Sequence, residues 1–127
     1  MSKNAIVFGG SGFLGSHVAD NLSEHGYNVT LFDIQPSSYI RPDQTMIVGD
    51  ILNSDKVNNA LKNKNVVFHF AGLSDLGKGT DQPLEVVNQN ILGTINLLNG
   101  AVKNNIKYVK KGHIVAMFRQ IVGYMTS

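Results

Sequence analysis

A glycine-rich turn near the start of the chain is the segment with the clearest potential for chemistry. Gly9, Gly12 and Gly15 fit the pattern G-x-x-G-x-x-G, after the apolar run 5–8 and at the start of a helical pattern. In such a turn the first glycine permits a sharp change of direction, the second leaves room for a pyrophosphate, and the third lets the helix pack closely on the strand. The spacing therefore predicts a phosphate-binding turn, with the hydroxyl of Ser11 as a further potential donor.

Backbone amides and one acid complete this predicted site. The N–H groups of Gly12, Phe13 and Leu14 are expected to face the phosphates at the positive end of the helix dipole. Asp33 ends the apolar run 29–32, 21 residues beyond Gly12, where a carboxylate accepts hydrogen bonds from the ribose hydroxyls of a dinucleotide. Its charge would repel a ribose phosphate, so NAD is favoured over NADP. The alternative is a structural glycine turn, with Asp33 as an ordinary strand-ending residue.

The elements that position these residues alternate between apolar runs and helical patterns. Strands are expected at 5–8, 29–32, 46–48, 66–70 and 106–109, and helices at 14–25, 53–61 and 81–104. This alternation is the signature of a mostly parallel sheet. The expected fold class is α/β, a Rossmann-like parallel sheet with flanking helices and strand order 3-2-1-4-5, in truncated form.

Apolar spacing also predicts which helix faces are buried. Leu14, Val18 and Leu22 recur every four residues in the first helix. Asn53 or Ser54 can cap the second helix through its side-chain oxygen. A longer stripe on the third helix is expected to face the sheet, and it consists of Val87, Ile91, Ile95, Leu98 and Val102.

Four segments, in order along the chain, resemble the motifs of one enzyme family. They are 9–15 (GGSGFLG), 48–51 (VGDI), 67–72 (VFHFAG) and 90–98 (NILGTINLL). Together they resemble the NAD-dependent epimerase/dehydratase family, extended short-chain dehydrogenases that mostly act on nucleotide sugars. The resemblance implies NAD as the cofactor and a nucleotide sugar as the substrate of the full-length form.

The resemblance also assigns individual residues to the cofactor. It implies that Asp50 and Ile51 meet the adenine, that the backbone of 70–72 lines the pyrophosphate and ribose, and that Asn90 lies beside the cofactor. His69, in an apolar run, is expected to be a packed core histidine. Taken with the turn and the ribose acid, the expected cofactor-binding residues are Gly9, Gly12, Phe13, Leu14, Gly15, Asp33, Asp50, Ile51, Phe70, Ala71, Gly72 and Asn90.

The resemblance ends before the family's catalytic pair, Tyr-x-x-x-Lys. In that pair the Tyr is the general acid/base, and the Lys lowers its pKa and holds the nicotinamide ribose. Here Tyr108 is followed four positions later by Gly112, and Tyr124 is followed by only three residues, so no catalytic residue is expected. We expect an NAD-binding domain over 1–110 and a divergent tail over 111–127 that is not a separate domain.

Composition narrows the classes of partner. The chain has no cysteine, which excludes disulfides and thiolate chemistry, and its histidines lack the spacing of a metal site. The formal net charge is only +2, so nucleic acid is not an expected partner. No run is long and apolar enough to span a membrane, so no membrane partner is expected and the cytoplasm is the expected location.

Three functions remain open on the sequence. The first is the cofactor-binding portion of a nucleotide-sugar epimerase or dehydratase, without the catalytic pair and the substrate domain. The second is a non-catalytic NAD-binding or regulatory module that pairs with another chain. The third, a Walker-type nucleotide-binding protein, rests on the G-x-x-x-x-G-K pattern at 72–78, where Gly79 replaces the expected Ser or Thr. Apolar surface left exposed without a C-terminal part also predicts self-association.

Overall fold

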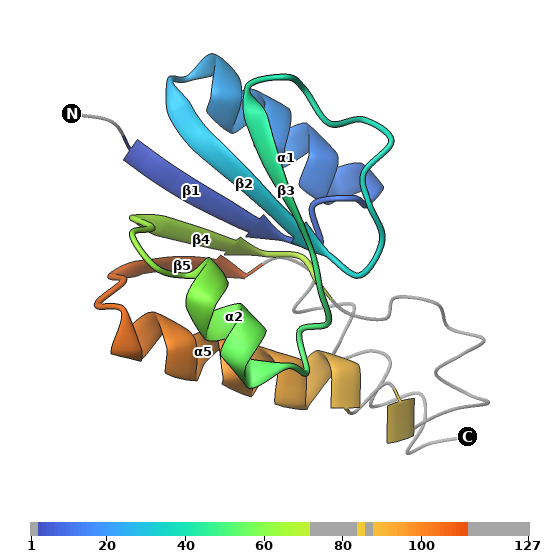
Figure 1. Ribbon diagram of the computed structural model, residues 1–127, viewed down its shortest axis with the longest axis vertical. Coiled ribbons are helices and arrows are strands. Elements are labelled where there is room, and N and C mark those ends of the chain that lie inside the picture. The colour runs from blue at the N-terminus through green and yellow to red at the C-terminus, as the bar shows by residue number, and fades with distance from the viewer. Residues whose placement is uncertain (1–2, 72–83, 86–87, 112–127) are drawn as a thin grey trace.

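Five parallel strands form the centre of the molecule. The computed structural model describes residues 3–71, 84–85 and 88–111 of the chain. Within them the sheet has the order β3-β2-β1-β4-β5, and every neighbouring pair is parallel (Figure 1). The strands are β1 (Lys3–Phe8), β2 (Tyr27–Asp33), β3 (Gln44–Val48), β4 (Val66–His69) and β5 (Tyr108–Lys111). The expected Rossmann-like architecture and strand order are confirmed.

Helices cover both faces of this sheet. They are α1 (Phe13–Glu24), α2 (Ser54–Ala60), η1 (Asn88–Leu92, a π-helical turn) and α5 (Gly93–Lys103). Helix α1 packs on one face, where Ala19 joins the apolar cluster of β1 and β2. Helices α2 and α5 lie side by side on the other face (Figure 1), over a core that includes Phe8 and Phe32. The centroids of these two rings are 4.7 Å apart.

Helix α2 begins as the sequence predicts. The Oδ1 atom of Asn53 accepts a hydrogen bond from the backbone N–H of Lys56 at 3.1 Å, which satisfies one donor of the first turn. Val57 and Ala60 are buried, as is Leu61 directly after the helix. Among the described residues, no helix combines the length and hydropathy that crossing a membrane requires.

The buried face of α1 differs from the expected stripe. Its buried residues are Gly15, Ser16 and Ala19, whereas Leu14 is 41% exposed. Small side chains on this face let the helix start lie against the glycine turn. Of the expected residues, Leu22 packs against the core, whereas Leu14 does not point inward.

The expected stripe on α5 is wrong in the same way. Ile95 and Leu98 are each 46% exposed and Val102 is 76% exposed, while Ile91 is half-buried and Val87 lies outside the described residues. The buried residues of α5 are Gly93, Leu97, Gly100 and Ala101. Two causes explain the error. The buried face is made mostly of small residues, and the π-helical turn before α5 shifts the phase of the 3.6-residue repeat.

The last strand also begins later than expected. Ile106 packs against the core from outside β5, which starts at Tyr108 and ends at Lys111. The expected division of the chain after residue 110 therefore falls inside this strand. Residues 112–127 lie outside the described residues, so the division into domain and tail stays a prediction.

Candidate functional site

The glycine turn joins β1 to α1 at the carboxyl edge of the sheet. Gly9 has a φ of +80°, a conformation that favours glycine. Its N–H donates to the carbonyl of Phe32 at 2.8 Å. A Cβ on Gly9 would lie 2.6 Å from the carbonyl carbon of Phe70. The fold itself therefore requires a glycine here.

Two further glycines of the turn are also explained by packing. A Cβ on Gly15 would overlap the carbonyl oxygen of Gly9, and a Cβ on Gly10 would lie 2.7 Å from the Cβ of Leu31. The contact at Gly15 brings the start of α1 onto the turn after β1, as the pattern predicts, and the contact at Gly10 brings the turn against β2. Gly9, Gly10 and Gly15 thus serve the protein's own packing.

Gly12 has no such internal reason. Its φ of −77° and ψ of 171° are extended backbone, which any residue adopts. A Cβ there would have only the carbonyl oxygen of Gly9 nearby, at 3.5 Å, an ordinary contact. The space above Gly12 is therefore open, and a side chain would fill it without disturbing the fold. Room of this kind is what a pyrophosphate needs to approach the backbone.

The N-terminus of α1 supplies donors beside that space. Among the described residues, the N–H groups of Phe13, Leu14 and Gly15 have no hydrogen-bond partner. The N–H of Gly12, which was expected to face a phosphate, instead donates to the carbonyl of Gly9 at 3.2 Å. No acidic residue stands in the first turn of α1. The helix start is thus an open, positively polarised end suited to an anion.

Asp33 ties the end of β2 to this turn. Its Oδ2 accepts from the N–H of Ser11 at 3.0 Å, and its Oδ1 accepts from the N–H of Gln35 at 3.2 Å. The hydroxyl of Ser11, predicted as a possible phosphate donor, donates to the carbonyl of Gln35 at 2.6 Å. The carboxylate is half-buried and stands next to the turn, where the sequence predicts it.

The next strand end carries Asp50 and Ile51. The N–H of Gly49 donates to the carbonyl of Asp33 at 2.9 Å, which joins the ends of β3 and β2. The Oδ1 of Asp50 accepts from the N–H of Leu52 at 2.9 Å. Within the described part of the chain, neither Asp50 Oδ2 nor the N–H of Ile51 has a partner. The side chain of Ile51 is buried in the core.

The backbone after β4 closes the turn from its other side. The N–H of Phe70 donates to the carbonyl of Phe8 at 2.8 Å. The peptide between Phe70 and Ala71 lies where a Cβ on Gly9 would stand, with its nitrogen at 2.7 Å. Phe70 and Ala71 are thus adjacent to the glycine turn. Gly72, and the Walker-like pattern that begins there, lie outside the described residues.

Asn90 lies in the π-helical turn η1 and is 3% exposed. The hydroxyl of Thr94 donates to the carbonyl of Asn90 at 2.7 Å, and the Nε2 of His69 lies 2.9 Å from the same hydroxyl oxygen. Because Thr94 has only one hydroxyl hydrogen, Nε2 of His69 must carry a proton and donate. This chain of bonds links the end of β4 to η1. His69 is the packed core histidine that the sequence predicts, at 2% exposure.

The expected cofactor residues that are described lie at the carboxyl ends of β1, β2, β3 and β4, or on η1 beside them (Figure 1). Parallel strands bring these ends to one edge, which is where α/β sheets bind ligands. The list of expected site residues did not include Asn96 on α5, whose amide contacts the turn of Asp50. Its place in the motif 90–98 was the available signal.

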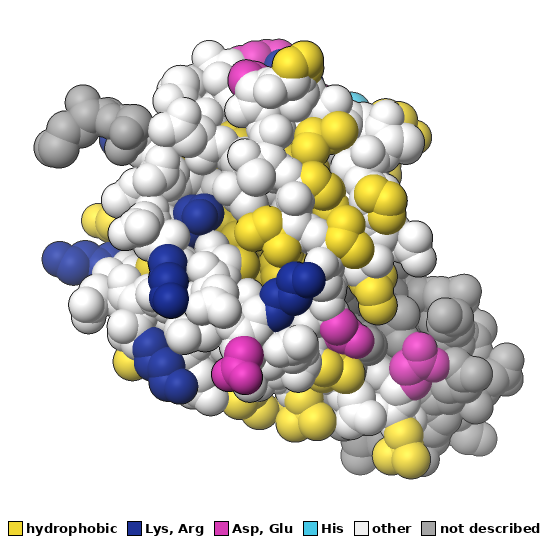
Figure 2. Space-filling model, viewed as in Figure 1, with side chains coloured by type: hydrophobic (Ala, Val, Ile, Leu, Met, Phe, Trp, Pro, Cys, Tyr) yellow, Lys and Arg dark blue, Asp and Glu magenta, His cyan; other side chains and the backbone are white. Residues whose placement is uncertain are grey.

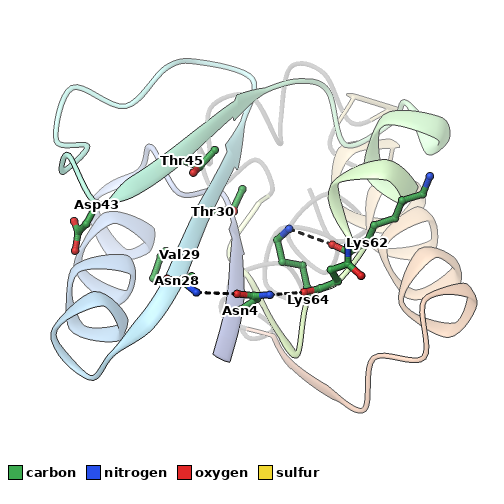
Figure 3. Close-up of a pocket in the computed structure, with 9 residues that line it drawn as sticks. Asn4, Asn28, Val29, Thr30, Asp43, Thr45, Lys62 and Lys64 are labelled. Atoms are coloured by element: carbon green, nitrogen blue, oxygen red, sulfur yellow. Dashed lines mark hydrogen bonds between the residues drawn. The ribbon is translucent and has the colours of Figure 1, made fainter. Parts of the chain in front are cut away.

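A cavity lies at the opposite, amino-terminal end of the strands (Figure 3) and has a volume of about 380 Å³. The ammonium group of Lys64 donates to the carbonyl of Lys62 at 3.3 Å beside it, and burial lowers the pKa of Lys64. None of the expected cofactor residues lines this cavity, so it is separate from the candidate site. Its lining consists of Asn4, Asn28, Val29, Thr30, Asp43, Thr45, Lys62, Asn63 and Lys64.

Comparisons with known proteins agree with the family resemblance of the sequence motifs. The model of the NAD dependent epimerase/dehydratase family matches residues 5–114. The bifunctional protein GAL10 of Candida maltosa is 35% identical over 117 residues, which cover 82% of this chain and 76% of that protein. A bifunctional UDP-glucose 4-epimerase and UDP-xylose 4-epimerase of Arabidopsis thaliana is 30% identical over 123 residues, which cover 84% of this chain and 35% of that protein.

A solved structure of MoeE5 in complex with UDP-glucose and NAD superposes with a TM-score of 0.77 at 32% identity, over 85% of this chain and 35% of MoeE5. The chain therefore spans about a third of the length of MoeE5 and of the Arabidopsis relative. The matched region runs from β1 through the last described strand and includes all four motifs. The chain belongs to the NAD-dependent epimerase/dehydratase family.

Proposed function

We propose that this chain binds NAD as the cofactor-binding region of a nucleotide-sugar epimerase or dehydratase. The observation that carries the proposal is Gly12, the one position of the turn where the fold tolerates a side chain and the sequence has none. Open space beside three unpaired N–H groups fits a pyrophosphate. The family and the NAD held by MoeE5 support the choice of cofactor.

The pyrophosphate and the adenosine of the cofactor then have counterparts in the chain. The pyrophosphate lies over Gly12, against the N–H groups of Phe13, Leu14 and Gly15. Asp33 retains unused lone pairs for the adenosine ribose hydroxyls, and its charge opposes the extra phosphate of NADP. The shape of this site depends on Gly9 and Gly15. Asp50 and Ile51 contact the adenine. The remaining residues, along the rest of the cofactor, are Phe70, Ala71, Gly72 and Asn90.

The proposed substrate class is a nucleotide sugar, because the relatives named above act on UDP-glucose and UDP-xylose or hold UDP-glucose. NAD, when bound, supplies a hydride acceptor. The residues of this chain bind and orient it. No tyrosine in the 127 residues is followed four positions later by lysine, so we propose that the chain alone turns over no nucleotide sugar. An assay of a UDP-sugar panel with NAD tests this, and robust turnover would refute it.

Calorimetric titration with NAD and NADP tests the binding proposal. The wild-type chain is expected to bind NAD more tightly than NADP. Gly12→Val is expected to stay folded, with only a small fall in the melting temperature from the less favourable N-cap of α1. It is expected to lose measurable NAD binding, because the valine side chain occupies the phosphate space.

Gly15→Ala is the matched contrast, because its added methyl group overlaps the carbonyl of Gly9. It is expected to lower the melting temperature as well as the affinity. A folded Gly12→Val protein with wild-type affinity for NAD would show that the phosphate lies elsewhere.

A further inference from the structure

Asn96 on α5 holds the turn that follows β3. Its Nδ2 donates to two consecutive carbonyls, those of Ile51 and Leu52, at 3.1 Å each. The two hydrogens of a side-chain amide are thereby both used. The partners lie 45 and 44 positions away in the sequence, so these bonds fix the turn relative to a separate element.

A glycine on the same helix makes room for this contact between α5 and the turn. Gly93 lies three positions before Asn96, which places both on one side of the helix. A Cβ on Gly93 would lie 2.6 Å from the Cγ2 of Ile51. The absence of a side chain at 93 therefore lets the turn approach α5 closely enough for the amide of Asn96 to reach it.

The bond from Asn96 reaches Asp50 through one peptide group. The carbonyl of Ile51 and the N–H of Leu52 belong to the same planar peptide and point in opposite directions. Asn96 holds the carbonyl, and the Oδ1 of Asp50 accepts from the N–H at 2.9 Å. Fixing that peptide plane therefore orients the carboxylate of Asp50. Its Oδ2 and the N–H of Ile51 then present one acceptor and one donor.

That pair matches the edge of adenine, which offers an amino donor and a ring-nitrogen acceptor side by side. We propose that Asn96 is a positioning residue for adenine recognition: it aligns Asp50 and Ile51 and thereby sets the preference for the 6-amino group of NAD. This inference rests on the proposed function. It adds a residue that touches no cofactor itself.

The test compares NAD with nicotinamide hypoxanthine dinucleotide, in which an oxo group replaces the adenine amino group and the adjacent ring nitrogen carries a hydrogen, so that both contacts of the pair are lost. Calorimetry on the wild-type chain is expected to show a preference for NAD of about tenfold or more, the scale of one hydrogen bond to a charged acceptor. Asn96→Asp, nearly isosteric but with no donors, is expected to reduce the preference to about twofold or less. Asn96→Ser, with one donor, is expected to fall between them and serves if the aspartate variant does not fold.

Asn104→Asp is the matched control. Asn104 lies just after the far end of α5, and its amide donates to the carbonyl and Oδ1 of Asn58 and to the carbonyl of Gly100. The same chemical change there is expected to lower the melting temperature while keeping the preference for NAD. A purely structural role for Asn96 would give the two variants the same ligand profile.

The outcomes separate the two proposals. A wild-type chain that binds neither dinucleotide refutes the proposed function. A wild-type chain that binds both equally refutes the adenine contact and the role of Asn96 with it. If the wild-type chain prefers NAD and a folded Asn96 variant keeps that preference, the positioning role alone is overturned.

Discussion

Asp33 has a structural role in the glycine turn and, in the proposed site, a role in selecting the cofactor. Its two carboxylate oxygens accept from the N–H groups of Ser11 and Gln35, so the acid holds the turn against the end of β2. The same negative charge faces the place of the adenosine ribose in the proposed site. One residue thus contributes to the local structure and, in the proposed site, to the discrimination between NAD and NADP.

Asp33→Asn is expected to narrow the preference for NAD over NADP by about 1–3 kcal/mol, the scale of hydrogen bonds to a charged acceptor. Titration with both dinucleotides measures it. Asp43→Asn is the control, since Asp43 is exposed and lines the cavity at the opposite end of the strands. An unaltered preference in the Asp33 variant would remove this residue from the ribose contact.

At the scale of elements, helix α5 is fitted to its neighbours by glycines. A methyl group on Gly93 would meet the Cγ2 of Ile51, and one on Gly100 would meet the Cδ1 of Leu61, both at 2.6 Å. The two contacts differ in how easily they relax. The Cγ2 of a β-branched side chain is nearly fixed, whereas the Cδ1 of leucine is the end of a side chain that can rotate.

Gly93→Ala is therefore expected to destabilise the fold by about 1–2 kcal/mol, because overpacking exceeds the gain in helix propensity. Gly100→Ala is expected to be nearly neutral, since that gain of about 1 kcal/mol offsets a smaller rearrangement. Urea unfolding of both variants compares them. Equal effects would contradict the assignment of the tight contact to Ile51.

The elements also show what the sequence can and cannot predict. The apolar runs within β1 to β4 predict these strands, because fully covered parallel strands are largely continuous apolar segments. The strand order follows from the Rossmann-like fold class rather than from the runs themselves. The glycine turn and Asp33 are predictable from local spacing. The inward face of α5 is not, because Gly93, Gly100 and Ala101 leave no apolar signal. The role of Asn96 depends on a partner 45 residues away, which no local pattern contains.

At the scale of the molecule, the outward side of α5 is apolar. Leu92, Ile95, Leu98 and Val102 are exposed, and hydrophobic side chains are visible along the lower edge of the surface in Figure 2, where α5 lies. They form a stripe from the end of η1 to near the end of α5. Such a continuous helix face, facing a copy of itself across a two-fold axis, would bury the same residues on both sides.

We expect the chain to self-associate through this stripe. Leu98→Lys combined with Ile95→Lys is expected to shift the mass measured by light scattering toward the monomer, because charges replace the centre of the apolar face. Val48→Lys is the control, as Val48 is comparably exposed at 45% but lies on the edge strand β3. A wild-type chain that is already monomeric at high concentration would contradict this expectation.

The absence of a packing constraint at Gly12 has a consequence for the evolution of this fold. Selection for stability alone preserves Gly9, Gly10 and Gly15, because each avoids a clash inside the turn. It does not preserve Gly12, where other residues fit the backbone. In a lineage that no longer needed the dinucleotide, position 12 would be free to drift while the other glycines persisted. A glycine at position 12 in a related protein therefore indicates that dinucleotide binding is still under selection, and another residue there indicates that it is not.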